Sequence, residues 1–274
     1  MRPPYRQGNF ICNATKFCAQ IQAHSSNGFH KRKVQMTDTS PEVDVPAEFI
    51  SFKYPLPHLA QALRGKGPVR IVAMGSSSTA GRLDVVPYPH RLELYLRARY
   101  QDRFPDLRID VLNRGKGGEE AIEELPRFES DIFAERPSMV IWQVGTNAVF
   151  HKEDMKYDLD KVAAAISEGL ARLRKQPMDV LLINPQYVTA MLLDSRAEDS
   201  ARMVSLISAA AERAQVDVFR RWALMRHWHV HNNVSFEQML DRTDDAKLHQ
   251  NDWSTLRVSV ALRDAIANAL PPFA

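Results

Sequence analysis

Short apolar segments rich in β-branched residues alternate with longer segments of helical periodicity from residue 50 onward. Strands buried on both faces are nearly continuously apolar, whereas a helix on one face of a sheet repeats its apolar residues every three or four positions. The predicted strands are 69–75, 108–115, 138–145, 179–186 and 216–219, and the predicted helices are 88–103, 119–135, 157–176, 195–215 and 253–268. This alternation predicts an α/β fold, a three-layer sandwich with a central parallel sheet of about five strands and helices on both faces.

The N-terminal part of the chain lacks this pattern. Residues 1–45 show no sustained period, carry a basic cluster at 30–33 and end in a segment with Pro and Asp. Such a composition is typical of chain that buries too little apolar surface to fold. We therefore expect a flexible extension over 1–45 and one folded domain over 46–274.

Composition narrows the choice of partner and compartment. The 36 basic and 33 acidic residues are interspersed and leave a net charge of +3, which does not favour nucleic acid. Cys12 and Cys18 are too few for a disulfide framework and lack the spacing of a zinc site. No segment reaches the ~18 apolar residues of a transmembrane helix or contains the apolar core of a signal peptide. We expect a cytoplasmic protein without a transmembrane segment.

The ends of the predicted strands carry the candidate chemistry, because ligands of parallel α/β sheets bind beyond the carboxyl ends of the strands. The first strand ends in "GSSST", which holds Ser77, and the second in "NRGKGGEEA", which holds Gly118. The third ends in "GTN", which holds Asn147. Taken alone, the serines fit a helix-capping turn or a phosphate-binding loop, but neither GxGxxG nor GxxxxGK[ST] occurs here.

A polar loop near the C-terminus, "DRTDDAKLHQNDW" over 241–253, supplies several aspartates and His249 just before the last predicted helix. A serine, an imidazole, an acid and backbone or amide donors at one end of a sheet are the groups that acyl transfer from an ester requires.

Three histidines in "HWHVH", His227, His229 and His231, alternate with other residues. In an extended strand they would share one face and suit zinc, but no acidic or cysteine ligand lies near them in the sequence, and a polar loop explains the pattern as well. We therefore predict no metal site.

The four blocks together resemble the SGNH, or GDSL-type, hydrolase family over roughly residues 66–270. The resemblance implies a flavodoxin-like sheet, Ser77 as nucleophile and His249 as general base. It also implies an oxyanion hole made by the Ser77 and Gly118 N–H groups and the Asn147 side chain. The sequence departs from the family in the first block, where Ser76 stands in place of the Asp of many members.

The family's acid usually lies three residues before the histidine, and this position is Ala246. Asp245 lies four residues before His249 and Asp244 five before it. A loop with one extra residue can still bring Asp245 to the imidazole, so we assign Asp245 as the orienting acid. Asp244 should then point away, because side chains alternate along an extended loop.

These residues predict a carboxylic ester hydrolase that works through an acyl-enzyme intermediate and needs no metal or organic cofactor. We expect a small-molecule or glycan ester as substrate, with a short acyl group such as a carbohydrate O-acetyl. The alternative is a non-catalytic carbohydrate- or ester-binding protein on the same scaffold, suggested by Ser76 and by the displaced aspartate. The oligomeric state is left open.

Overall fold

The structure is a computed structural model that describes residues 41–82, 84–193 and 195–272. The predicted flexible extension lies outside the described residues up to position 40. In the segment that follows, Val43 and Val45 pack against the hydrophobic core. The Asp44 carbonyl accepts a hydrogen bond from Trp228 Nε1 at 2.9 Å. Packing against the domain therefore begins before position 46.

The secondary structure follows the predicted alternation. The strands are β1 (Val69–Gly75), β2 (Ile109–Gly115), β3 (Met139–Gln143), β4 (Asp179–Ile183) and β5 (Asp217–Phe219). The longer helices are α1 (Pro57–Arg64), α3 (Tyr88–Tyr100), α8 (Leu159–Leu173), α9 (Arg196–Ala214), α10 (Arg221–His231) and α12 (Asp252–Ala269). The short helices are α2 (Ser77–Ala80), α4 (Ala121–Glu124), α5 (Phe128–Asp131), α6 (Thr146–Phe150), α7 (Lys152–Met155) and α11 (Phe236–Met239). Single 3₁₀ turns are η1 (Ala47–Phe49), η2 (Leu125–Arg127), η3 (Phe133–Glu135) and η4 (Thr189–Met191).

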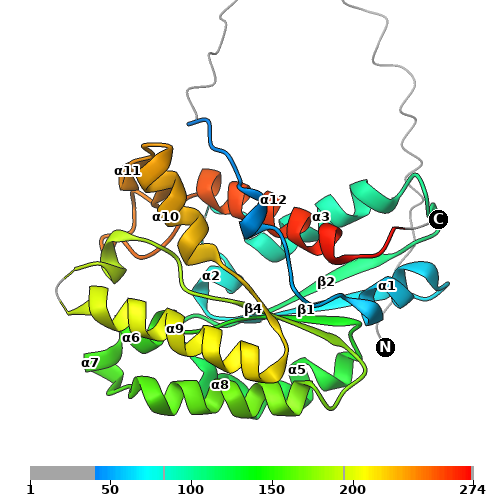
Figure 1. The fold of residues 1–274 in the computed structure, drawn as a ribbon, viewed down its shortest axis with the longest axis horizontal. Helices are drawn as coiled ribbons and strands as arrows, with labels where there is room; N and C mark the ends of the chain where they lie inside the picture. Colours follow the sequence, from blue (N-terminus) through cyan, green and yellow to red (C-terminus); the bar gives the residue numbers. More distant parts are fainter. Residues whose placement is uncertain (1–40, 83, 194, 273–274) are drawn as a thin grey trace, which may run out of the picture. The chain divides into compact units, whose positions relative to one another are not determined.

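The strands form one parallel sheet in the order β2-β1-β3-β4-β5, which confirms the predicted fold class. The chain leaves β1 toward one edge of the sheet to form β2, then crosses to β3 and continues toward the other edge (Figure 1). In such a doubly wound sheet the ligand crevice lies where the strand order reverses. Here this point lies between the carboxyl ends of β1 and β3.

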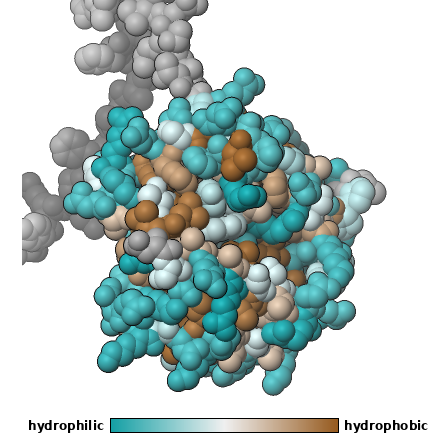
Figure 2. All heavy atoms as spheres, turned by 60° about the vertical axis from the view of Figure 1, so that its left-hand side comes forward, coloured by the Kyte–Doolittle hydropathy of each residue, from teal (hydrophilic) through white to brown (hydrophobic). Residues whose placement is uncertain are grey.

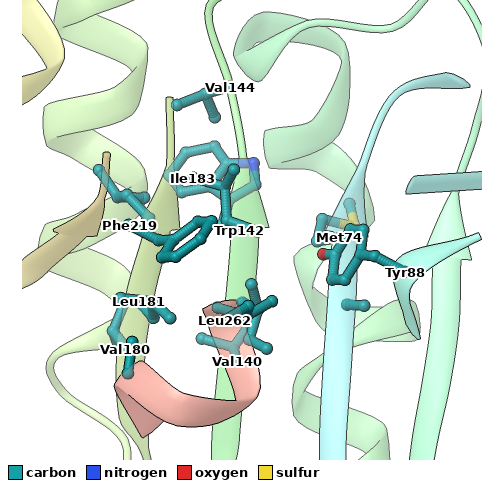
Figure 3. Packing of buried hydrophobic residues seen from close by; sticks show 14 of the residues in the cluster. Met74, Tyr88, Val140, Trp142, Val144, Val180, Leu181, Ile183, Phe219 and Leu262 are labelled. Atoms are coloured by element: carbon teal, nitrogen blue, oxygen red, sulfur yellow. The ribbon is translucent and has the colours of Figure 1, made fainter. Parts of the chain in front are cut away.

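Helices cover both faces of the sheet. In Figure 1, α8 and α9 lie together below it, whereas α3, α10 and α12 lie above it. The pairs α8–α9 and α3–α12 also contact each other directly. Between these layers the strand side chains are buried, and Figure 3 shows Val140, Leu181 and Phe219 extending from neighbouring strands into this core.

Two predicted elements differ from the structure. The helix expected over 119–135 is divided into α4, η2, α5 and η3. Pro126 lies in η2, and because proline lacks an N–H and its ring crowds the preceding turn, it interrupts a regular helix. The three histidines of "HWHVH" lie in α10, so they are neither in a strand nor in a loop.

None of the helices within the described residues is both long enough and apolar enough to cross a membrane. Figure 2 brings forward the side of the molecule that carries α6, α7 and α11, and there the hydrophobic areas are separate and surrounded by hydrophilic side chains.

Candidate active site

Ser77 stands directly beyond the carboxyl end of β1, as the first residue of α2. The turn that presents it depends on Gly75, whose φ is +154°. A Cβ at this position would lie 2.9 Å from Gln143 Oε1 and would overlap the Thr79 hydroxyl. Glycine therefore lets the chain turn tightly enough to place the Ser77 side chain in the crevice.

Ser76 faces the opposite way, into the protein. It is buried, and its N–H and its hydroxyl both donate to Gln143 Oε1, at 3.2 and 3.1 Å. The Thr79 hydroxyl donates to the same oxygen at 3.3 Å. Gln143 of β3 thus fastens the serine turn after β1, and Ser76 has a structural role in this turn.

The structure brings Ser77 and His249 together although 172 residues separate them in the chain: Ser77 Oγ lies 2.9 Å from His249 Nε2. The loop that carries His249 is fixed on both sides. Leu240 and Gln250 form an isolated antiparallel bridge, and the Asn251 side chain caps the start of α12 by accepting from the Ser254 N–H. This distance suits proton transfer between the hydroxyl and the imidazole.

The acid beside His249 is Asp244, so the choice of Asp245 from the sequence does not fit the structure. Asp244 Oδ2 lies 2.8 Å from His249 Nδ1 and also accepts the backbone N–H groups of Leu248 and His249. Asp244 is buried, whereas Asp245 is exposed. The five-residue spacing is possible because the chain turns here: the Lys247 N–H donates to the Asp244 carbonyl, and Lys247 has a left-handed φ of 55°. The extended loop assumed from the sequence is therefore wrong.

The surroundings favour an ionised Asp244. Burial alone would raise the pKa of this carboxyl, but the hydrogen bonds from His249 and Leu248 hold its pKa below the ordinary value. An ionised carboxylate can accept the Nδ1–H of His249, which leaves Nε2 free to accept a proton from Ser77.

Arg82 also reaches this group, and no sequence motif pointed to it. Its Nη1 lies 3.5 Å from Asp244 Oδ1 and 2.8 Å from His249 Nδ1. The pKa of His249 is lowered, mainly by burial; the Asp244 carboxylate acts against this shift, and the Arg82 charge adds to it. Arg82 thus tends to keep the imidazole neutral, the form that can accept a proton.

Gly118 lies in the turn after β2, and Asn147 lies in α6, which follows β3. Gly118 has φ +81° in the turn after β2, and a Cβ on the preceding Gly117 would come within 3.9 Å of the Ser77 Cβ. Asn147 is buried at the start of α6, and its Nδ2 donates to the Glu119 carbonyl at 2.7 Å. The amide therefore ties its own loop to the glycine loop. That the Ser77 and Gly118 N–H groups and the Asn147 side chain bind an oxyanion remains a prediction.

Two buried carboxyl groups that the sequence did not single out follow the glycine turn, and one of them, Glu120, supports the segment that carries Asn147. Glu120 accepts hydrogen bonds from the N–H groups of Gly145 and Ala148, and so holds the turn that carries Asn147. Burial raises the pKa of Glu120, partly offset by these hydrogen bonds. Burial also raises the pKa of Glu124, which accepts from Trp142 Nε1.

Two of the three histidines of α10 have structural hydrogen-bond partners. His227 Nε2 lies 2.9 Å from Asp44 Oδ1, and His229 Nδ1 lies 2.8 Å from the Val234 carbonyl oxygen. Within the described residues, no three His, Cys, Asp or Glu side chains are grouped so that they could hold a metal ion.

Comparison with known proteins gives a family and a curated relative. A profile of the Non-GDSL lipase-like family matches residues 42–270. An acetylxylan esterase from Geobacillus stearothermophilus is 25% identical over 100 residues, which cover 34% of this chain and 46% of the relative. The matched segment thus spans about half the length of that relative.

Several solved structures share the fold. LAE5, an α/β hydrolase enzyme from the metagenome of Lake Arreo, Spain, matches with a TM-score of 0.60 and 19% identity over 75% of this chain and 99% of its own. The acetyl xylan esterase AlAXEase matches with a TM-score of 0.60 and 20% identity over 71% and 98%. Axe2, an acetylxylan esterase from Geobacillus stearothermophilus, matches with a TM-score of 0.58 and 18% identity over 72% and 94%. At these identities the likeness concerns the fold.

Proposed function

This chain belongs to the Non-GDSL lipase-like family, and from that premise we propose that it is a serine esterase that cleaves carboxylic esters through an acyl-enzyme intermediate. The SGNH-type resemblance noted in the sequence is confirmed at the level of the family and fold. One observation carries the proposal: Ser77 Oγ, the two nitrogens of His249 and Asp244 Oδ2 form a continuous chain with distances of 2.9 and 2.8 Å.

The mechanism assigns each group of this chain a role. His249 Nε2 takes the proton of Ser77 Oγ as that oxygen attacks the ester carbonyl carbon, and Asp244 stabilises the imidazolium that forms. His249 then gives the proton to the departing alcohol oxygen. In the second half of the reaction His249 takes a proton from a water molecule as the water oxygen attacks the acyl carbon. His249 then returns this proton to Ser77 Oγ as the acyl–oxygen bond breaks, which releases the acid and restores the free serine.

The negative charge on the carbonyl oxygen needs donors that are already in place. The N–H groups of Ser77 and Gly118 and the Asn147 amide are the groups we assign to it. One N–H of the Asn147 amide donates to the Glu119 carbonyl. We assign the second N–H of this amide to the oxyanion. Losing one such donor typically costs on the order of 3 kcal/mol of transition-state stabilisation.

For the substrate, we propose a short acyl ester, such as an O-acetyl group on a carbohydrate. The acetylxylan esterases among the similar proteins support this choice. A series of p-nitrophenyl esters from acetyl to octanoyl tests the chain length: kcat/KM should be highest for acetyl, and a maximum at octanoyl would contradict the proposal.

The central test is covalent labelling of the nucleophile. A fluorophosphonate probe should label the protein stoichiometrically at Ser77, and Ser77→Ala should lose the label and at least about 10⁴-fold in kcat for p-nitrophenyl acetate. Ser78→Ala, one position along the same serine run, should still be labelled. Absence of labelling in the folded protein would instead favour a non-catalytic ester- or carbohydrate-binding protein.

A further inference from the structure

A small cavity lies beside the Ser77–His249 pair, on the side of α3, α10 and α12. The volume open to the centre of a water molecule is about 30 Å³, roughly twice what one water needs, and both Ser77 and His249 form part of its lining. Three polar side chains from separate parts of the chain line it as well: Tyr88 of α3, Arg221 of α10 and Gln250 of the histidine loop. The esterase chemistry derived above uses none of these three.

Arg221 places a positive charge in the protein interior without a carboxylate to balance it. The side chain is 2% exposed, its Nε donates to the Asn184 carbonyl at 3.1 Å, and its Nη2 donates to Gln186 Oε1 at 2.7 Å. Both acceptors are neutral, and within the described residues no Asp or Glu forms an ion pair with this guanidinium. A buried charge normally occurs with a partner of opposite charge, because removal from water is costly.

Arg221 nevertheless remains charged near neutral pH. Burial lowers its pKa to about 10, still well above 7. Burial also raises the pKa of Tyr88, so its hydroxyl stays protonated and can donate a hydrogen bond.

Two further donors of the cavity lack a hydrogen bond of ordinary geometry. Gln250 Nε2 and the Tyr88 hydroxyl are both buried and unpaired by this measure, although the Thr79 side chain lies close enough to the Tyr88 hydroxyl to interact with it. Buried polar groups are almost always paired, so two unpaired groups on one cavity call for a ligand. An amide N–H₂ can only donate, as can a guanidinium, so the missing ligand must be an acceptor.

We propose that this cavity binds a small carboxylate, held by Arg221, Tyr88 and Gln250. A carboxylate has two acceptor oxygens and a negative charge, and so matches both the donors and the unbalanced cation. A water molecule would supply two acceptor sites but would leave the charge of Arg221 unbalanced. The remaining lining includes Val85, Pro87 and Val258, which suit the short apolar part of such an acid.

The carboxylate has two possible sources, and this part of the inference rests on the proposed esterase function. It is either the acid that ester cleavage releases beside Ser77, or a carboxylate at the far end of a short acyl chain still attached to its alcohol. Acetate represents the first source and monoethyl succinate the second.

Binding is measured on full-length Ser77→Ala protein by isothermal titration, so that no turnover interferes. Sodium acetate or monoethyl succinate should bind saturably, whereas acetamide, the neutral analogue of acetate, and sodium chloride at equal ionic strength should not. Saturable binding of acetate identifies the released acid as the ligand, and binding of monoethyl succinate alone identifies the acyl terminus. No saturable binding of either compound would overturn the proposal.

Tyr88→Phe, made in the Ser77→Ala protein, separates a binding role from a structural one. It removes a hydroxyl that makes no hydrogen bond of ordinary geometry in the free protein, so the melting temperature should change little, yet the Kd for the carboxylate should rise at least about tenfold because a hydrogen bond to a charged group is lost. Gln250→Met should weaken binding in the same direction. An unchanged Kd in both variants would overturn the assignment of the site.

Tyr157→Phe serves as the matched control, because the Tyr157 hydroxyl donates to Glu123 Oε2 at 2.9 Å, and neither residue lines the cavity. It should lower the melting temperature and leave the carboxylate Kd unchanged. Fluorophosphonate labelling distinguishes failure of the esterase proposal from failure of the carboxylate site. Carboxylate binding without labelling at Ser77 would contradict the proposed esterase activity but not the proposed binding site.

Discussion

Two adjacent aspartates, Asp244 and Asp245, have opposite surroundings, so their substitution should have unequal consequences. Asp244→Asn keeps the shape of the side chain but favours the wrong tautomer of His249, and we expect a loss in kcat of up to about 10⁴-fold. Asp245→Asn changes an exposed side chain and should alter kcat less than about twofold, because a surface substitution away from the reacting groups has little effect. Hydrolysis of p-nitrophenyl acetate by both folded variants measures this difference, and equal losses would contradict the assignment of Asp244.

At the same scale, the charge of Arg82 should be visible in the pH dependence. His249 must be neutral to accept a proton, and its pKa is lowered by burial and by Arg82, so activity should persist below the ordinary histidine pKa of about 6.5. Arg82→Gln removes a nearby positive charge, which raises the pKa of His249 and moves the acid limb of kcat/KM to higher pH. Arg82→Lys keeps the charge and should leave the limb nearer that of the parent. A limb that does not move in Arg82→Gln would contradict this role.

At the scale of elements, the packing of α8 on the sheet depends on one glycine. A Cβ at Gly169 would overlap the Trp142 ring and lie 3.0 Å from Leu125 Cδ2. Gly169→Ala gains up to about 1 kcal/mol of helix propensity, but overpacking costs about 1–3 kcal/mol, so the free energy of unfolding should fall. Gly67→Ala is the control, because a Cβ there meets no atom within 4 Å. Urea denaturation compares the two, and a more stable Gly169→Ala protein would show that α8 can move away from β3.

The elements themselves could be predicted to different degrees. Strong local signals mark β1, β4 and α8. Burial on both faces makes a strand continuously apolar, and burial on one side of a helix repeats its apolar residues every three or four positions. The segment 119–135 has a helical pattern as well, but Pro126 breaks it, and this local signal was present in the sequence. The histidine-containing helix α10 was missed because an alternating pattern of five residues is too short to establish a strand, and in a helix these three histidines do not share one face.

For the molecule as a whole, strand order predicts a gradient of local stability. β1 and β3 lie inside the sheet and pair on both sides, whereas β5 has three residues and pairs only with β4. Amide hydrogen exchange should therefore be slowest in β1 and β3 and faster in β5, since local opening requires fewer buried contacts to break at the edge. Mass spectrometry of peptides from each strand measures this order, and equal protection of β5 and β3 would contradict it.

Much of the site could be read from the sequence because the fold places the carboxyl ends of parallel strands at one edge. Ser77, Gly118, Asn147 and His249 are adjacent to predicted elements, and the structure indeed brings Ser77 and His249 into contact. The position of these residues at strand ends did not determine which atoms their side chains contact. The amide of Asn147, for example, holds the Glu119 carbonyl of another loop.

The sequence by itself determined the α/β class, the parallel sheet and the family, since each depends on patterns within short segments. Only the tertiary structure decided that Asp244 meets His249, because two successive turns, closed by hydrogen bonds from Asp244 N–H to the Asp241 carbonyl and from Lys247 N–H to the Asp244 carbonyl, fold the loop that was assumed to be extended. The same holds for Arg82, 167 residues from His249, and for Arg221, whose neighbours come from distant segments. Contacts of this kind leave no periodic trace in the chain, because they depend on how complete elements pack and not on the spacing of residues along any one of them.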